Sequence, residues 1–303
     1  MRRSPRAISF LLGLGVALAA PGVAQGQAAP EAGEPVHVAP RVVPRVVENP
    51  YPWIAAAYLV KRDGAVLWAG NAHARLAPAS LAKMMTALLA IESGRLDEPM
   101  TVGASVLRAT GTRIGLTPGE RFRTRDLLAA TIVRSANDAC RALAERLGPS
   151  VERFVARMNE RAARLGMADT RFADPCGHDR EGQYSSAADL ARLAEEVIGH
   201  DEYLRLARMQ KVRIRTLPRG AGATATAATG AGTRSFTLRN TNALLGRYEG
   251  AIGLKTGYTD GAGNCLVALV ERNGVRVLAV LLNAPNRWWN AAGLLDRAFA
   301  AAR

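Results

Sequence analysis

The 303-residue chain has few of the residues that build metal and redox sites. It contains four His and three Cys, with neither an H-E-x-x-H cluster nor C-x-x-C spacing, so the sequence gives little support to a zinc hydrolase. No GxGxxG or Walker pattern indicates a phosphate-binding loop, and no repeat is visible. Hydrophobic residues make up 49% and charged residues 22%, which is ordinary for a globular protein and excludes wholesale disorder.

Lysine is also scarce, because only 4 of the 40 strongly basic residues are Lys and the rest are Arg. The formal charge of +14 favours anionic partners, such as nucleic acid, anionic lipid or an acidic polymer, but no nucleic-acid motif is present. Arg stays charged in proteins, whereas burial can make Lys neutral. We interpret Lys61 and Lys211 as ordinary surface residues and expect functional roles for Lys83 and Lys255.

No segment is apolar enough to be a clear membrane span. Residues 1–26 contain a basic start, an apolar run from Ala7 to Ala20 and small residues that allow cleavage after Ala24 or Gly26. This order predicts a secretory signal peptide, with a retained single-pass anchor as the alternative. We expect residues 27–50 to form a linker, and the mature protein to be soluble and periplasmic after export through the inner membrane.

Export permits disulfide bonds, but three cysteines leave at least one free or paired between chains. Cys140 and Cys265 have apolar neighbours and are expected to be buried core residues. The pairing, including that of Cys176, stays open. A cysteine nucleophile is not supported, because no His lies in a recognisable partner motif.

Strand patterns at both ends of the chain enclose helical patterns. An antiparallel sheet built from both termini is therefore expected, with helices between, which is an α+β fold. The predicted strands are 54–61, 65–70, 264–272 and 275–283, the last two joined by Asn273-Gly274. The predicted helices are 81–92, 126–134, 138–147, 151–165, 187–198 and 288–301. Residues 217–234 are expected to form a surface loop.

The first motif is Ser80-Leu81-Ala82-Lys83, at the start of a predicted helix. A spacing of three places Ser80 and Lys83 on one helix face, and a helix start offers free backbone N–H groups to an oxyanion. Serine is a weak nucleophile that needs a base, and a neutral Lys can serve. Taken alone, the motif is weak, because S-x-x-K occurs by chance in many proteins and more often reflects a capping Ser and a solvated Lys.

Two further motifs follow along the chain. Ser135-Ala136-Asn137 lies between two helical segments and is either a helix cap or a hydroxyl and an amide for substrate contact. Lys255-Thr256-Gly257 precedes the C-terminal strands and is either a turn or a carboxylate site that a substrate backbone can approach closely. Two of the four lysines, Lys83 and Lys255, fall within the three motifs, which favours the functional interpretation.

The three motifs match the S-x-x-K, S-D-N and K-T-G signatures of β-lactamases and penicillin-binding proteins. The chain resembles the serine-type D-Ala-D-Ala carboxypeptidases, the low-molecular-weight penicillin-binding proteins of peptidase family S11, over roughly residues 50–285. The resemblance rests on APASLAKMMTALLA, SANDACRALAE, LGMADTRFADPCG, YSSAADLARLA, RNTNALL and GLKTGYTDGAGNCLVALV. It implies a β-lactamase/transpeptidase-like catalytic domain over 51–303. Its antiparallel sheet is flanked by helices, with an inserted all-helical subdomain at about 96–200.

The resemblance also implies roles for the catalytic residues. Ser80 would be the acyl-enzyme nucleophile, Lys83 the base and Ser135 a proton relay. The middle motif departs from the family pattern, since Ala stands where Gly or Asp is commoner. The block from Asp174 to His178 departs as well, which puts its loop contacts in doubt.

The resemblance implies substrate-binding residues too. Asn137 would contact the substrate, and Lys255 and Thr256 would hold its terminal carboxylate. Gly257 would allow close approach, and the backbone N–H of Tyr258 would join that of the nucleophile in an oxyanion hole. No metal or organic cofactor is implied.

The expected activity is removal of the terminal D-alanine from peptidoglycan stem peptides, with covalent binding of β-lactam inhibitors. The alternatives are a peptidoglycan DD-endopeptidase or a β-lactamase on the same fold, and a non-catalytic wall-binding module. Nucleic acid is not an expected partner, and peripheral contact with the membrane or cell wall stays open.

Overall fold

The computed structural model of the chain describes residues 47–218 and 233–301. The predicted signal peptide, most of the predicted linker and most of the predicted loop at 217–234 lie outside these residues. Among the helices of the two described ranges, none combines the length and the apolar character needed to cross a membrane.

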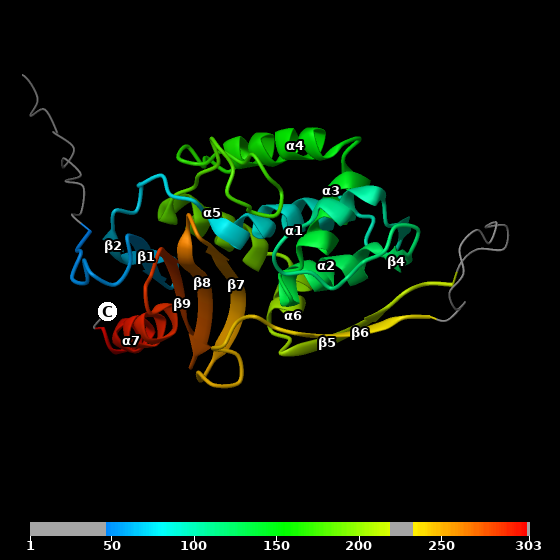
Figure 1. Cartoon of the computed structure of the whole chain (residues 1–303). Helices are drawn as coiled ribbons and strands as arrows, with labels where there is room; N and C mark the ends of the chain where they lie inside the picture. The colour runs from blue at the N-terminus through cyan, green and yellow to red at the C-terminus, as the bar shows by residue number, and fades with distance from the viewer. Residues whose placement is uncertain (1–46, 219–232, 302–303) are drawn as a thin grey trace, which may run out of the picture. The chain divides into compact units, whose positions relative to one another are not determined.

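A five-stranded antiparallel sheet combines strands from the N-terminal and C-terminal parts of the described chain, as the sequence predicts (Figure 1). Its order is β2-β1-β9-β8-β7. The strands are β1 (Ala57–Arg62), β2 (Ala65–Gly70), β7 (Ala251–Thr259), β8 (Gly263–Arg272) and β9 (Val275–Leu282). Asn273 and Gly274 both have positive φ, as the tight β8–β9 turn requires. The sequence pattern did not predict β7, the edge strand that carries the third motif.

Helices cover both faces of this sheet, because side chains on successive strand positions point to opposite faces. On one face, Tyr58 and Val60 join the apolar cluster that includes α7 (Arg287–Ala300). On the other face, Leu59 packs in the larger cluster with α5 (Ala187–Ile198) and α6 (Asp201–Ala207). The sheet is therefore buried on both sides, and its edge strand β7 faces the helical part of the molecule.

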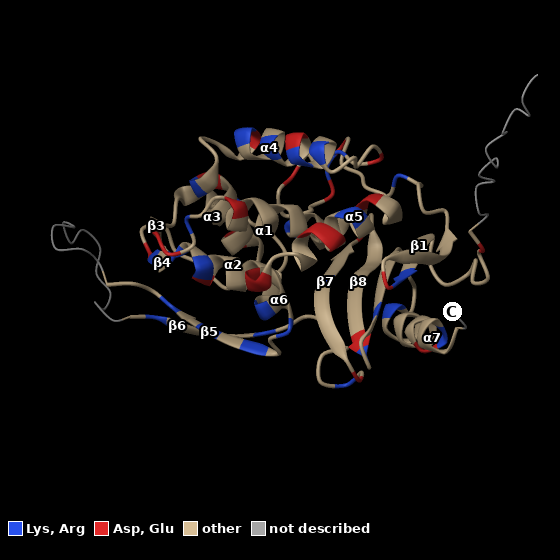
Figure 2. Ribbon diagram, turned by 180° about the vertical axis from the view of Figure 1, so that it is seen from behind, with Lys and Arg blue, Asp and Glu red and all other residues tan. Residues whose placement is uncertain are grey.

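The remaining helices pack together beside β7. They are α1 (Lys83–Glu92), α2 (Thr124–Val133), α3 (Asn137–Leu147) and α4 (Val151–Arg164), with short 3₁₀ helices η1 (Ala79–Ala82) and η2 (Ala104–Arg108). Nearly all of α1 is buried, whereas α4 carries charged residues along its outer side (Figure 2). The predicted helix at 81–92 is right except that its first turn is the tighter η1. Two small hairpins were not predicted: β3 (Pro99–Thr101) with β4 (Arg121–Arg123), and β5 (Lys211–Arg215) with β6 (Ser235–Arg239).

A disulfide joins Cys140 on α3 to Cys176 in the loop before α5. Cys140 is buried as predicted, and the pairing that the sequence left open is decided by packing of α3, which brings Cys140 to a cysteine 36 positions away. Cys265 on β8 is buried, as expected, and is the free cysteine among the described residues. The cross-link fastens the start of α3 to the loop that follows α4.

We expect loss of this cross-link to lower the free energy of unfolding by about 3–4 kcal/mol, since the bond closes a loop of this length in the unfolded chain. The measurement is denaturant unfolding of a Cys140→Ala/Cys176→Ala variant and of the wild type with and without reductant. Cys265→Ala is the matched control, and its free energy of unfolding should still fall when reductant is added. A wild-type transition that does not move with reductant would contradict the expectation.

Candidate active site

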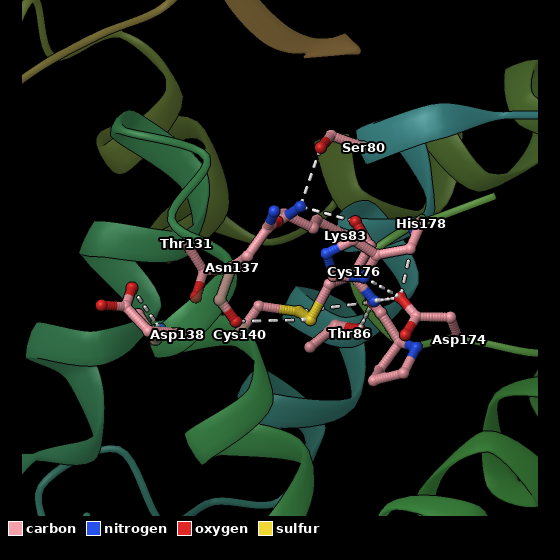
Figure 3. The surroundings of a disulfide bond; sticks show 12 residues. Ser80, Lys83, Thr86, Thr131, Asn137, Asp138, Cys140, Asp174, Cys176 and His178 are labelled. Carbon is pink, nitrogen blue, oxygen red and sulfur yellow. Dashed lines mark hydrogen bonds and ion pairs between the residues drawn. A yellow bond between two sulfur atoms is a disulfide. The ribbon is translucent and has the colours of Figure 1, made fainter. Parts of the chain in front are cut away.

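Ser80 and Lys83 lie together where η1 passes into α1 (Figure 3). The Lys83 Nζ atom is 2.8 Å from the Ser80 Oγ atom and 2.5 Å from the carbonyl oxygen of Cys176. Ser80 is partly exposed, whereas Lys83 has no solvent-accessible surface. The serine can therefore meet a ligand while its lysine partner stays shielded from water.

Burial changes the charge state of this lysine. Desolvation lowers the pKa of Lys83 from 10.5 to about 7, against the opposing pull of the Asp174 carboxylate. Burial also disfavours the charge on Asp174, but hydrogen bonds from His178 and Cys176 outweigh it and hold that pKa at about 2. Near neutral pH a large fraction of Lys83 is therefore uncharged and able to accept a proton.

The backbone around Ser80 is held by close packing. Ala79 has a φ of 49°, a left-handed conformation that non-glycine residues rarely adopt. A Cβ atom at Gly177 would overlap the Ala79 carbonyl, and one at Gly257 would lie 2.9 Å from the Ala79 Cβ and 3.1 Å from the Ser80 nitrogen. The two glycines let the loop before α5 and strand β7 close on the serine from two sides.

Ser135 and Lys255 form a second pair that meets across 120 positions of sequence. The Lys255 Nζ atom on β7 donates a hydrogen bond of 2.8 Å to Ser135 Oγ, and Ser135 has a φ of 60°. Lys255 is almost fully buried, and burial, followed by the charges of Lys83 and Arg287, lowers its pKa well below the usual value. A bound carboxylate would reverse this shift, because it would restore a partner to the ammonium group.

Asn137 opens α3 and lies beside this pair. Its Nδ2 atom donates to the Thr110 carbonyl at 2.6 Å, while its buried Oδ1 atom has no partner among the described residues. The neighbouring Asp138 accepts hydrogen bonds from the backbone of Ile114, Gly115 and Leu116, which fixes the loop that Asn137 contacts. The side-chain amide of Asn137 is thus held at the start of α3, two positions after Ser135.

The structure therefore brings together the candidate residues on η1, α3 and β7. Thr256 is buried, and its Oγ1 is 2.7 Å from that of Thr241. Tyr258 follows on the edge strand with an exposed side chain, hydrogen-bonded to Asp260. All predicted site residues lie where η1, α3 and β7 meet.

Several contacting residues were not anticipated from the sequence. Arg287 at the start of α7 donates to the Gly257 carbonyl at 2.6 Å and places a further cation near Lys255. Thr86, one turn after Lys83, donates to the Pro175 carbonyl at 2.6 Å. The spacing of three between Lys83 and Thr86 could have indicated this contact from the sequence. The contact of Arg287 could not be predicted, because it joins segments that are distant in the sequence.

A possible metal-binding group within the described ranges lies apart from these residues. The ligand atoms of Glu92, Glu196 and His200 approach one another, but the Arg161 guanidinium already forms ion pairs with both glutamates. An arginine in this position neutralises the carboxylates, so the group is explained as an ion-pair network.

An antiparallel sheet flanked by helices, with a partly exposed serine and two buried lysines where they meet, is the arrangement of the serine–lysine class of acyl-transfer enzymes. A family model described as D-alanyl-D-alanine carboxypeptidase matches residues 51–286. The chain belongs to this family, which confirms both the resemblance and the fold class predicted from the motifs.

Relatives and solved structures agree. The chain is 36% identical to D-alanyl-D-alanine carboxypeptidase DacF of Bacillus subtilis, over 76% of this chain and 57% of that protein. It is 33% identical to DacD of Escherichia coli, over 77% and 58%. The solved Streptomyces K15 DD-transpeptidase superposes with a TM-score of 0.76 at 26% identity, over 84% of this chain and 100% of that structure. The chain thus spans a little over half the length of these two curated relatives.

We expect Gly177→Ala to reduce serine acylation by at least about 100-fold, because the new methyl group would displace the Ala79 backbone by an ångström or more. Gly182→Ala is the matched control: Gly182 also has positive φ, but a Cβ there would meet only the Arg171 side chain at 3.6 Å. The measurement is the rate of labelling by a fluorescent penicillin on folded protein. Equal rates for the two variants would show that Gly177 does not position the serine.

Proposed function

We propose that this protein is a serine D-Ala-D-Ala carboxypeptidase that removes the terminal D-alanine from peptidoglycan stem peptides. The observation that carries the proposal is the contact of 2.8 Å between Ser80 and a fully buried lysine whose pKa is lowered to about 7. Membership of the D-alanyl-D-alanine carboxypeptidase family supports the substrate class.

In the proposed acylation step, Ser80 Oγ attacks the carbonyl carbon of the penultimate D-alanine. Neutral Lys83 takes the serine proton as the oxygen–carbon bond forms. The backbone N–H groups of Ser80 and Tyr258 are proposed to stabilise the oxyanion, which fits the close approach of β7 to the Ser80 nitrogen. Ser135 then relays a proton to the leaving nitrogen, the C–N bond breaks, and free D-alanine departs.

Deacylation uses the same groups in reverse order. A water molecule attacks the ester carbonyl while Lys83 accepts its proton, and the proton returns to Ser80 Oγ as the ester bond breaks. The product is the shortened peptide with a new carboxylate, and the enzyme returns to its starting state. Neither step needs a group beyond water and the side chains named.

The carboxylate end of the substrate is proposed to bind at Lys255 and Thr256. Lys255 is buried beside Ser135 and near Arg287, so this region is rich in positive charge and poor in water. Anionic ligands gain most in such an environment. Asn137, at the start of α3 and two positions after Ser135, is proposed to contact the substrate through its side-chain amide.

The proposal extends to the setting of the enzyme. The 1–26 segment is proposed as a signal peptide, 27–50 as a linker and 51–303 as the catalytic domain, with an inserted helical subdomain at about 96–200. Peptidoglycan and β-lactams are reached outside the cytoplasmic membrane, so the mature enzyme would act in the periplasm. Comparison of free pentapeptide with a crosslinked peptide dimer separates a carboxypeptidase from an endopeptidase.

Ser80→Ala should bind substrate nearly as well as the wild type but form no penicillin adduct and release no D-alanine. The reason is that Ser80 Oγ is the atom that becomes acylated. Mass spectrometry of the penicillin-treated protein, with peptide mapping, measures the adduct directly. An adduct mapped to Ser135 would overturn the assignment.

The two buried lysines should respond differently to arginine. Lys83→Arg should lower the penicillin acylation rate by about 100-fold or more, because arginine stays protonated and cannot act as the base. Lys255→Arg keeps the cation and should retain measurable acylation with weaker substrate binding. In the wild type the rate should rise with pH through about 7, as Lys83 loses its proton.

The measurement is the acylation rate of folded wild type and both variants between pH 5 and 9. A near-normal rate for Lys83→Arg would exclude Lys83 as the base. If Lys255→Arg were inactive and Lys83→Arg active, Lys255 would be the base and Lys83 the residue that binds the carboxylate.

A further inference from the structure

A pocket of about 360 Å³ opens next to the segment that leads into the nucleophile, and Lys255 is not among the residues that line it. It lies between the segment before Ser80, the loop before α5 and the β7–β8 turn. The residues that line it are Ala77, Ala79, residues 178–181, Gln183 and Gly261. We call it the 178–183 pocket. Its size is at the small end of ligand sites and suits one amino-acid side chain.

The position of the pocket follows the direction of the proposed substrate. The terminal carboxylate is placed at Lys255 and Thr256, and the scissile carbonyl at Ser80. The peptide upstream of that carbonyl then continues along β7 past Tyr258, toward Gly261. The scissile carbonyl belongs to the penultimate D-alanine. Consecutive Cα atoms are about 3.8 Å apart, so the Cα atom of the residue before the two D-alanines lies about that distance from the Cα atom of the penultimate D-alanine. The pocket starts at Ala79, directly next to the nucleophile.

The charges of the pocket are of both signs, and two of them are unpaired. Asp179 is engaged, since its carboxylate accepts hydrogen bonds from Thr259 Oγ1 at 2.7 Å and from the Gly261 nitrogen at 3.0 Å. This fixes the turn that forms one wall. Arg180 and Glu181 are exposed, and no ion pair joins either of them to another residue of 47–218 or 233–301. A cation and an anion are therefore free to meet a ligand.

We propose that the 178–183 pocket binds the side chain of the stem-peptide residue that precedes the two D-alanines, and prefers a side chain ending in both an amino group and a carboxylate. Arg180 would bind the carboxylate through its planar fork, and Glu181 the ammonium group. A side chain ending in an amine alone would leave Arg180 without a partner. This inference rests on the proposed function, because the direction of the peptide comes from it.

The test uses two acylated pentapeptides that differ only in the third residue, lysine in one and diaminopimelate in the other. The kcat/KM for D-alanine release is measured for wild type, Arg180→Gln and Glu181→Gln. We expect the wild type to prefer the diaminopimelate peptide by about tenfold, the size of one charge-assisted hydrogen bond at a partly exposed site. Arg180→Gln should abolish the preference by slowing only that peptide, whereas Glu181→Gln should slow both.

The control is Arg164→Gln, which removes an exposed arginine at the end of α4 that does not line the pocket. It should change neither peptide. Penicillin acylation of Arg164→Gln should equal that of the wild type. A diaminopimelate peptide amidated at its side-chain carboxylate should behave like the lysine peptide.

Binding separates failure of this inference from failure of the proposed function. Dissociation constants of both peptides are measured on the Ser80→Ala protein, with and without Arg180→Gln. If the wild type releases D-alanine equally from both peptides and Arg180→Gln changes neither, the pocket inference is wrong while the activity stands. If no D-alanine is released, the activity is wrong, and equal dissociation constants would then reject the pocket as well.

Discussion

Burial of a single amine next to a hydroxyl is the constraint on which the rest of this structure depends. Lys83 has no exposed surface, and its Nζ contacts only Ser80 Oγ and a backbone carbonyl among the described hydrogen-bond partners. Desolvation makes the neutral form accessible near pH 7, which an exposed lysine would not allow. The fold must therefore exclude water from the lysine and still admit a peptide to the serine.

The surrounding segments meet that requirement by packing against α1 from several directions. The loop before α5 supplies the carbonyls of Pro175 and Cys176 to Thr86 and Lys83, and the disulfide joins this loop to α3. Glycines at the two closest approaches to Ala79 remove side chains that would keep the segments apart. Such dense packing over-determines the left-handed backbone before the serine, which would otherwise relax.

The two buried lysines divide the proposed chemistry because of their partners. The Asp174 carboxylate acts on Lys83 but only partly offsets its desolvation. The charges that act on the pKa of Lys255 are the cations Lys83 and Arg287, so an anionic substrate would supply the negative charge that is missing. Substrate binding would also reduce the unfavourable positive charge around Lys83. In the proposed mechanism, one end of the site would recognise a carboxylate while the other would perform proton transfer.

The sequence alone determined the features that depend on near neighbours along the chain. The spacing of Ser80 and Lys83 puts both on one helix face, Asn273-Gly274 requires a tight turn, and the apolar periodicities placed the main helices to within a few residues. The third motif was found, but its strand β7 was not predicted. Gly253, Lys255 and Gly257 interrupt the run of apolar and β-branched residues by which a strand is identified in a sequence. Only the tertiary structure decided the pairing of Cys140 with Cys176, the contact between Ser135 and Lys255, and the burial that lowers the pKa of Lys83. These depend on how distant segments pack, which no local pattern encodes.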